Sequence, residues 1–108
     1  MNRLASLGGG SCGTALAIAL APRYGRITLW THEHDFAARM ASSRENDVYL
    51  PGFVLPANVE PGSDLPAALD QASVVLSVMP SRFVRQLYQQ MLPHLTPVMR
   101  FVSATKGI

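Results

Sequence analysis

Short apolar runs alternate along the chain with segments whose apolar residues recur at helical spacing. The runs at Leu4–Leu7, Ile27–Trp30 and Ser73–Val78 predict strands, and the last is apolar enough to be buried on both faces. A further strand is expected near Val59 and a final one over Val98–Thr105. This alternation is typical of β-α-β units around a parallel sheet.

The segments between these strands carry the helical patterns. Ser11–Ala21 is dense in Ala and Leu and is followed by Pro22, which predicts a buried helix. Helical spacing recurs over residues 36–41, and Asp64 is placed to cap a short helix over Leu65–Leu69. The last predicted helix is amphipathic, with one apolar face made of Phe83, Val84, Leu87, Tyr88, Met91 and Leu92.

Five strands joined through helices by right-handed crossovers predict a doubly wound, Rossmann-type α/β fold. Such a fold has a mainly parallel sheet with helices on both faces. The stretch from residue 43 to residue 62 is rich in Pro, Gly and Asn, so we expect loop around the short strand near Val59. The 108 residues amount to one domain, spanning residues 1–108.

The first candidate for chemistry is a glycine turn between the first strand and the first helix. Residues 8–13 match G-x-G-x-x-G in the context that this motif requires. Gly8 would permit the tight turn, Gly10 would leave room for a pyrophosphate, and Gly13 would let the helix pack closely on the sheet. Free N–H groups at the helix start would face the phosphates. The pattern favours dinucleotide binding over a flexible turn without a ligand.

Two polar residues follow the turn. Ser11 could contact a phosphate or cap the helix, and we favour the phosphate contact. Cys12 could be a redox-sensing thiol, but a small inert residue beside the cofactor is the better interpretation, since it is the single cysteine. A lone cysteine also suits a reducing compartment, and no apolar run approaches the length of a membrane helix. We therefore expect a soluble, cytoplasmic protein.

The end of the second strand should meet the adenosine ribose of the cofactor. An acidic residue there suits the 2′-hydroxyl of NAD, and a basic one suits the 2′-phosphate of NADP. The chain offers both, His32 and Glu33, and we lean slightly to NADP with NAD tolerated.

His34 and Asp35 follow directly, but no third convergent ligand is evident, so we expect no metal site. The net charge of +2, with scattered basic residues, does not support a nucleic-acid partner.

Beyond the glycine turn, several segments resemble bacterial glycerol-3-phosphate dehydrogenases. They occur in the expected order along essentially the whole chain, as Gly8–Ala17, Leu29–Trp30, Arg44–Gly52, Val78–Ser81 and Ser103–Ile108. Two of them, N-x-x-Y-L-P-G and A-T-K-G-I, are far more specific than the glycine turn. Within these segments Trp30 and Tyr49 are assigned to packing rather than to ligand contact.

The resemblance implies roles for particular residues. Ser11 and Cys12 would contact the cofactor on its pyrophosphate side, with Cys12 standing where family members usually carry an aromatic residue. His32 would lie near the adenosine phosphate, and Pro80 at the nicotinamide side. Lys106 matches a lysine that contacts both cofactor and glycerol phosphate. An ammonium at that edge could neutralise a phosphate or polarise a carbonyl oxygen, whereas an edge-strand lysine that blocks sheet pairing is the alternative.

The resemblance also implies a reaction: hydride transfer between NAD(P)H and dihydroxyacetone phosphate, giving sn-glycerol 3-phosphate for phospholipid synthesis. In the family, the proton-donor lysine and most phosphate ligands belong to a helical C-terminal domain. We therefore expect no catalytic residue and little turnover in these residues alone, and self-association, as in a homodimer, through surface that such a domain would cover. Two alternatives stay open, a reductase of the same superfamily with another hydroxy-acid substrate and a non-catalytic NAD(P)-sensing module.

Overall fold

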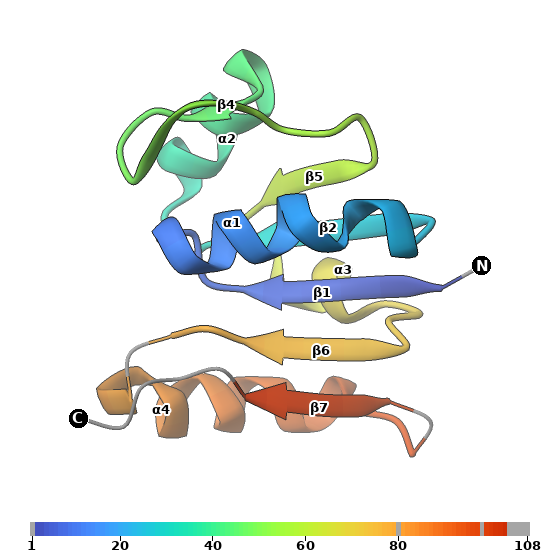
Figure 1. The fold of residues 1–108 in the computed structure, drawn as a ribbon. Helices are drawn as coiled ribbons and strands as arrows, with labels where there is room; N and C mark the ends of the chain where they lie inside the picture. Colours follow the sequence, from blue (N-terminus) through green and yellow to red (C-terminus); the bar gives the residue numbers. More distant parts are fainter. Residues whose placement is uncertain (1, 80, 98, 104–108) are drawn as a thin grey trace.

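A parallel sheet runs through the centre of the protein (Figure 1). The computed structural model describes residues 2–79, 81–97 and 99–103. In these residues the sheet consists of β1 (Arg3–Leu7), β2 (Arg26–Trp30), β5 (Val59–Gly62), β6 (Val74–Ser77) and β7 (Arg100–Ser103). The strand order is β5-β2-β1-β6-β7, and every neighbouring pair is parallel. The predicted doubly wound sheet, including the strand near Val59, is confirmed.

Helices follow the strands on both sides of this sheet (Figure 1). They are α1 (Ser11–Leu20), α2 (His34–Ser43), α3 (Leu65–Leu69) and α4 (Ser81–Met91), with 3-10 turns at η1 (Ala21–Arg23) and η2 (Leu92–His94). The predicted cap of α3 is present, since the Ala67 amide donates to Asp64 Oδ1 at 3.2 Å. Within the described part of the chain, no helix has the length and apolarity that crossing a bilayer requires.

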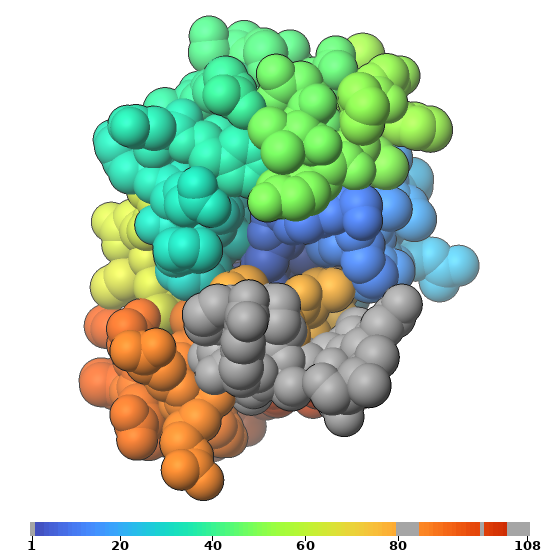
Figure 2. Space-filling view, turned by 90° about the vertical axis from the view of Figure 1, so that its left-hand side faces the viewer, coloured from blue at the N-terminus to red at the C-terminus, as the bar shows by residue number. Residues whose placement is uncertain are grey.

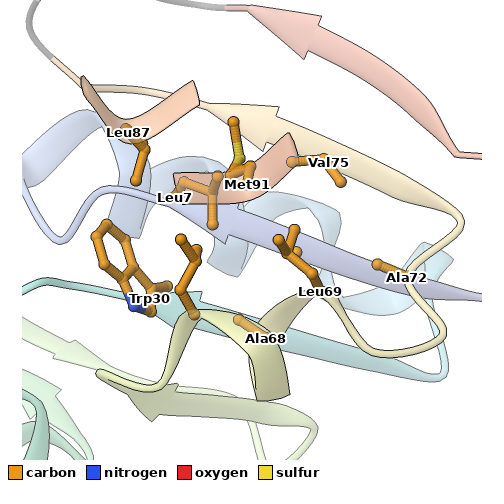
Figure 3. Packing of buried hydrophobic residues seen from close by; sticks show 10 residues of the cluster. Leu7, Trp30, Ala68, Leu69, Ala72, Val75, Leu87 and Met91 are labelled. Atoms are coloured by element: carbon orange, nitrogen blue, oxygen red, sulfur yellow. The ribbon is translucent and has the colours of Figure 1, made fainter. Parts of the chain in front are cut away.

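Alternate residues along each strand face the two helical layers, as the pleat of a strand dictates. On the side of α1 and α2, Leu4, Ile27 and Leu76 are buried in one apolar cluster with Ala17 and Met40. On the opposite side a second cluster unites strand residues with α3 and α4, and Figure 3 shows Leu7, Trp30, Val75, Leu69, Leu87 and Met91 meeting there. Because the strands are buried on both faces, their sequences are nearly continuous runs of apolar residues.

The described part of the apolar face predicted for the last helix, which leaves out the side chains of Phe83 and Val84, is only partly buried. Leu87 and Met91 of α4 are 5% and 1% exposed, whereas Tyr88 is 46% exposed and Leu92, the first residue of η2, is 58% exposed. The ring centroid of Tyr88 lies 5.6 Å from that of Phe101 in β7, which is itself exposed. Among the described residues, sequence periodicity therefore identifies two buried positions of the helix correctly, while the two beside them stay open to solvent.

The loop predicted between residues 43 and 62 is wrong for its first half. Here β3 (Glu45–Asn46) and β4 (Leu50–Val54) pair in an antiparallel hairpin. The hairpin is entered through Arg44, which ends α2 with φ of 60° and donates from Nη2 to the carbonyl oxygens of Pro56 and Val59, each at 2.7 Å. Contacts with the following segment stabilise this unit, and local sequence preference does not reveal them.

The sheet core gives a direct stability test. Ile27 is fully buried, so Ile27→Val should lower the free energy of unfolding by about 1 kcal/mol, because one methylene is removed from a packed cluster. Val54, 74% exposed, is the control, and Val54→Ala should change it by less than about 0.5 kcal/mol. Urea unfolding of the two variants measures both values, and equal losses would contradict the assigned core.

Candidate functional site at the carboxyl edge of the sheet

The three central strands end level with one another. Leu7 of β1 is the register partner of both Trp30 in β2 and Ser77 in β6. The Gly8 amide donates to the Trp30 carbonyl at 2.8 Å, and the Val78 amide donates to the Leu7 carbonyl at 2.9 Å. Beyond this line, β1 leads to α1 on one face and β6 leads to α4 on the other. That divergence makes a crevice of the kind in which open α/β sheets bind ligands.

The glycine turn occupies the centre of this edge. Gly8 has φ of +134°, and a Cβ there would lie 3.0 Å from the carbonyl oxygen of Val78. A Cβ on Gly13 would collide with the carbonyl oxygen of Gly8, whereas one on Gly10 would meet nothing within 4 Å. The tight turn and the close helix packing expected of Gly8 and Gly13 are thus present. The open space at Gly10 is what a pyrophosphate contact would require.

The start of α1 faces this open space with its backbone groups. Gly10 is the N-cap residue and supplies no side-chain cap, and the first turn carries no acidic residue. Ser11 is therefore not the cap but the first helical residue, and its side chain is exposed, as is that of Cys12. The first N–H groups of a helix have no partner within it, and together with the helix dipole they attract anions.

A groove of about 360 Å³ opens around the turn. Its walls come from residues 8–13, residues 31–33 with Phe36, Tyr49, and the Val78–Met79 pair after β6. Figure 2 looks onto this edge and shows a hollow between the blue N-terminal part of the chain, the teal segment around α2 and the orange end of β6. The groove has the size of small-ligand pockets. Four segments far apart in the sequence meet in it.

His32 and Glu33 both reach this groove from the end of β2, and both are exposed. His32 also lines a neighbouring hollow of about 220 Å³, whose walls include Trp30, Met79, Gln86 and Leu87. The basic and the acidic candidates for the ribose are therefore adjacent on one wall. Within the part of the chain that the structure describes, neither side chain forms a hydrogen bond or an ion pair, so both are open to a ligand.

His34, by contrast, is directed to another part of the surface. Its Nδ1 lies 3.0 Å from Ser63 Oγ, and it lines a separate hollow on the side of α3. Among the described residues, no three His, Cys, Asp or Glu side chains are grouped so that they could hold a metal ion.

The two aromatic residues assigned to packing differ in their positions. Trp30 is 5% exposed and lies in the apolar cluster beneath α3 and α4, as expected (Figure 3). Tyr49 is 51% exposed in the groove wall, with its ring edge-on to Phe36 at a centroid distance of 5.8 Å. Tyr49 thus packs against Phe36, as the assignment expected, but the hairpin places the ring at the mouth of the groove rather than in the core.

Asn46 is the residue that sequence reasoning missed. Its side chain is fully buried, and Nδ2 donates to the Gly9 carbonyl and to Thr14 Oγ1, both at 2.8 Å. The Tyr49 amide donates to Asn46 Oδ1 at 3.0 Å. The N-x-x-Y-L-P-G pattern marks this asparagine as a family feature, yet its partners in the glycine turn lie 37 and 32 positions away. Only the fold brings them together.

Two predicted site residues, Pro80 and Lys106, lie outside the described residues. The strands that lead to them are described, and they end side by side. Ser77 of β6 is the register partner of Ser103 of β7, so both strands point to the same edge as the glycine turn. The positions of the two side chains in the groove stay predictions.

Sequence and structure comparisons place the chain among known proteins. A family model described as NAD-dependent glycerol-3-phosphate dehydrogenase N-terminus matches residues 3–108. A protein of Koribacter versatilis named glycerol-3-phosphate dehydrogenase (NAD(P)+) is 50% identical over 109 residues, and one of the same name from Acidobacterium capsulatum is 41% identical over 112. Each match covers 100% of this chain but 32% and 33% of the relative. The chain thus spans about a third of the length of these curated relatives.

A solved structure agrees. The crystal structure of glycerol-3-phosphate dehydrogenase from Coxiella burnetii superposes with a TM-score of 0.93 at 34% identity, over 99% of this chain and 33% of that one. The parallel sheet and the glycine turn at its switch point define a Rossmann-type domain. Within that class, the chain belongs to the family of NAD-dependent glycerol-3-phosphate dehydrogenase N-terminal domains.

The close approach of Gly13 to the Gly8 carbonyl is testable through stability. Gly13→Ala should lower the free energy of unfolding by about 1–3 kcal/mol, because the added methyl group meets backbone that cannot move aside. Gly62→Ala is the matched control, since a Cβ there meets nothing within 4 Å. Thermal unfolding followed by circular dichroism compares the two, and a Gly13→Ala protein as stable as the control would refute the packing.

Proposed function

We propose that this chain binds a nicotinamide dinucleotide at the carboxyl edge of its sheet, with the pyrophosphate against Gly10 and the start of α1. The observation that carries the proposal is the combination of an open Gly10 with an uncapped helix N-terminus in one groove. Family membership supports the same ligand. The proposed cofactor-binding residues are Gly8, Gly10, Ser11, Cys12, Gly13, His32, Pro80 and Lys106.

The function we infer for the protein is that of a glycerol-3-phosphate dehydrogenase, which interconverts dihydroxyacetone phosphate and sn-glycerol 3-phosphate for phospholipid synthesis in the cytoplasm. The reduced cofactor, when bound, supplies the hydride that the carbonyl carbon receives. The task of this domain is to hold the nicotinamide at the groove, since correct placement of reactants removes much of the barrier. The names of the relatives favour this reaction over another hydroxy-acid reductase and over a non-catalytic sensor.

Lys106 is the residue that we place against substrate. It is the single lysine of these 108 residues, and it follows the strand that ends beside Ser77. Its ammonium would stabilise negative charge that develops on the substrate oxygen and would attract the phosphate. We propose that the proton that completes the alcohol comes from a second lysine, as the resemblance to the family implies.

The pyrophosphate site is tested at Gly10. Gly10→Ala should weaken NADH binding at least about tenfold, because the methyl group would occupy the space assigned to the phosphates. The loss of a glycine N-cap should cost at most about 1 kcal/mol of stability, which an unfolding curve measures separately. Gly62→Ala, outside the groove, should bind NADH normally. Unchanged affinity in Gly10→Ala would rule out the proposed site.

The preference between the two dinucleotides is tested at His32. We propose a slight preference for NADPH, and His32→Ala should weaken NADPH binding about tenfold more than NADH binding, because it removes a donor to the 2′-phosphate. His34→Ala is the control, since His34 contacts Ser63 away from the groove. Fluorescence titration of each protein with both cofactors gives the ratio, and equal losses for the two cofactors would assign His32 another role.

A further inference from the structure

Two asparagines hold the two ends of α1 in the same chemical way. At the end distant from the groove, Asn58 Nδ2 donates to the carbonyl oxygens of Ala21 and Tyr24, at 2.8 and 2.9 Å. At the end that faces the groove, Asn46 Nδ2 donates to the Gly9 carbonyl and to Thr14 Oγ1, both at 2.8 Å. Of these acceptors, Gly9 belongs to the glycine turn and lines the groove, and Thr14 lies in the first turn of α1, next to the proposed cofactor residues.

The side chain of Asn46 is enclosed by the protein and fully hydrogen-bonded. The side chain is fully buried and does not line the groove, so it is inaccessible to a ligand. Both of its N–H groups and its oxygen are engaged, because the Tyr49 amide donates to Oδ1 at 3.0 Å. A buried amide satisfied in this way is rigid, and removing it would leave the Gly9 carbonyl and the Tyr49 amide without these partners.

These contacts connect the hairpin to the glycine turn. The Gly9 carbonyl immediately precedes Gly10, where the pyrophosphate is proposed to lie. Thr14 is in the first turn of α1, and its amide donates to the Gly10 carbonyl at 3.0 Å. The same asparagine fixes the backbone at Tyr49, whose ring forms part of the groove wall. One side chain thus determines the position of both the floor and one wall of the groove.

We infer that Asn46 is a positioning residue for cofactor binding: its amide clamps the glycine turn in the conformation that receives the pyrophosphate and places Tyr49 at the mouth of the groove. This inference rests on the proposed function. The asparagine acts through Gly9, Thr14 and Tyr49 and touches no ligand itself. Its effect should therefore be confined to the pyrophosphate part of the cofactor.

The matched pair Asn46→Ala and Asn58→Ala tests this inference. Each variant loses one amide that donates twice, so both should lower the unfolding midpoint. At a temperature where both are folded, Asn46→Ala should bind ADP-ribose about tenfold more weakly than the unmodified protein, while its affinity for adenosine changes less than about twofold. Asn58→Ala should bind ADP-ribose normally. Normal binding by Asn46→Ala, or an equal loss in Asn58→Ala, would overturn the inference.

Thr14 offers a second route if Asn46→Ala fails to fold. Thr14→Val removes one acceptor of the clamp and should weaken ADP-ribose binding, whereas Thr14→Ser keeps the hydroxyl and should retain it. Amide hydrogen exchange of the ligand-free protein adds a readout independent of binding. Exchange over residues 9–13 should accelerate in Thr14→Val or Asn46→Ala and not in Asn58→Ala, and uniform exchange rates would overturn the clamp. Failure of the unmodified protein to bind ADP-ribose would instead refute the proposed function.

Discussion

The carbonyl oxygen of Gly8 lies so close to Gly13 that no side chain can stand between the end of β1 and the first turn of α1. That approach lets α1 begin directly over the carboxyl edge of the sheet and directs its unpartnered N–H groups toward the crevice beside β6. A β-carbon on Gly13 would push the helix away from β1, and one on Gly8 would press against the Val78 backbone, so either would misplace the groove. The geometry of the proposed cofactor site therefore follows from a backbone contact, and only afterwards from side chains.

The sheet determines where this contact lies. Leu7, Trp30 and Ser77 end their strands in register, and backbone bonds from Gly8 and Val78 extend the pairing one residue beyond β1 and β6. Because buried strands of this kind must be apolar on both faces, their sequences are distinctive, and composition and periodicity predict them well. The glycine spacing is equally distinctive, since Gly8 and Gly13 meet steric requirements and Gly10 leaves open space within six consecutive residues. Those parts of the fold and of the site could be read from the chain itself.

The hairpin over residues 45–54 could not be predicted in that way. Its first strand has two polar residues, and its second includes Pro51 and Gly52 and exposes Phe53 and Val54. No alternation of apolar and polar positions marks it as a strand. Its stability depends on Arg44, whose guanidinium reaches carbonyl groups beyond the hairpin, and on Asn46, whose amide reaches the glycine turn. Bonds between distant segments leave no local signal, which is why Asn46 was missed and the place of Tyr49 in the groove wall was not foreseen.

The same bonds explain why N-x-x-Y-L-P-G is a more specific family mark than the glycine turn. A glycine turn meets requirements that any dinucleotide-binding sheet shares. Within the motif, by contrast, Asn46 anchors the hairpin beneath the turn, Tyr49 enters the groove wall, and Gly52 adopts φ of +89° in β4. Three of the five motif positions thus have separate structural tasks, and those of Asn46 and Tyr49 depend on a hairpin docked against the glycine turn. In this chain the docking through Asn46 therefore determines the shape of the groove on the side of the hairpin.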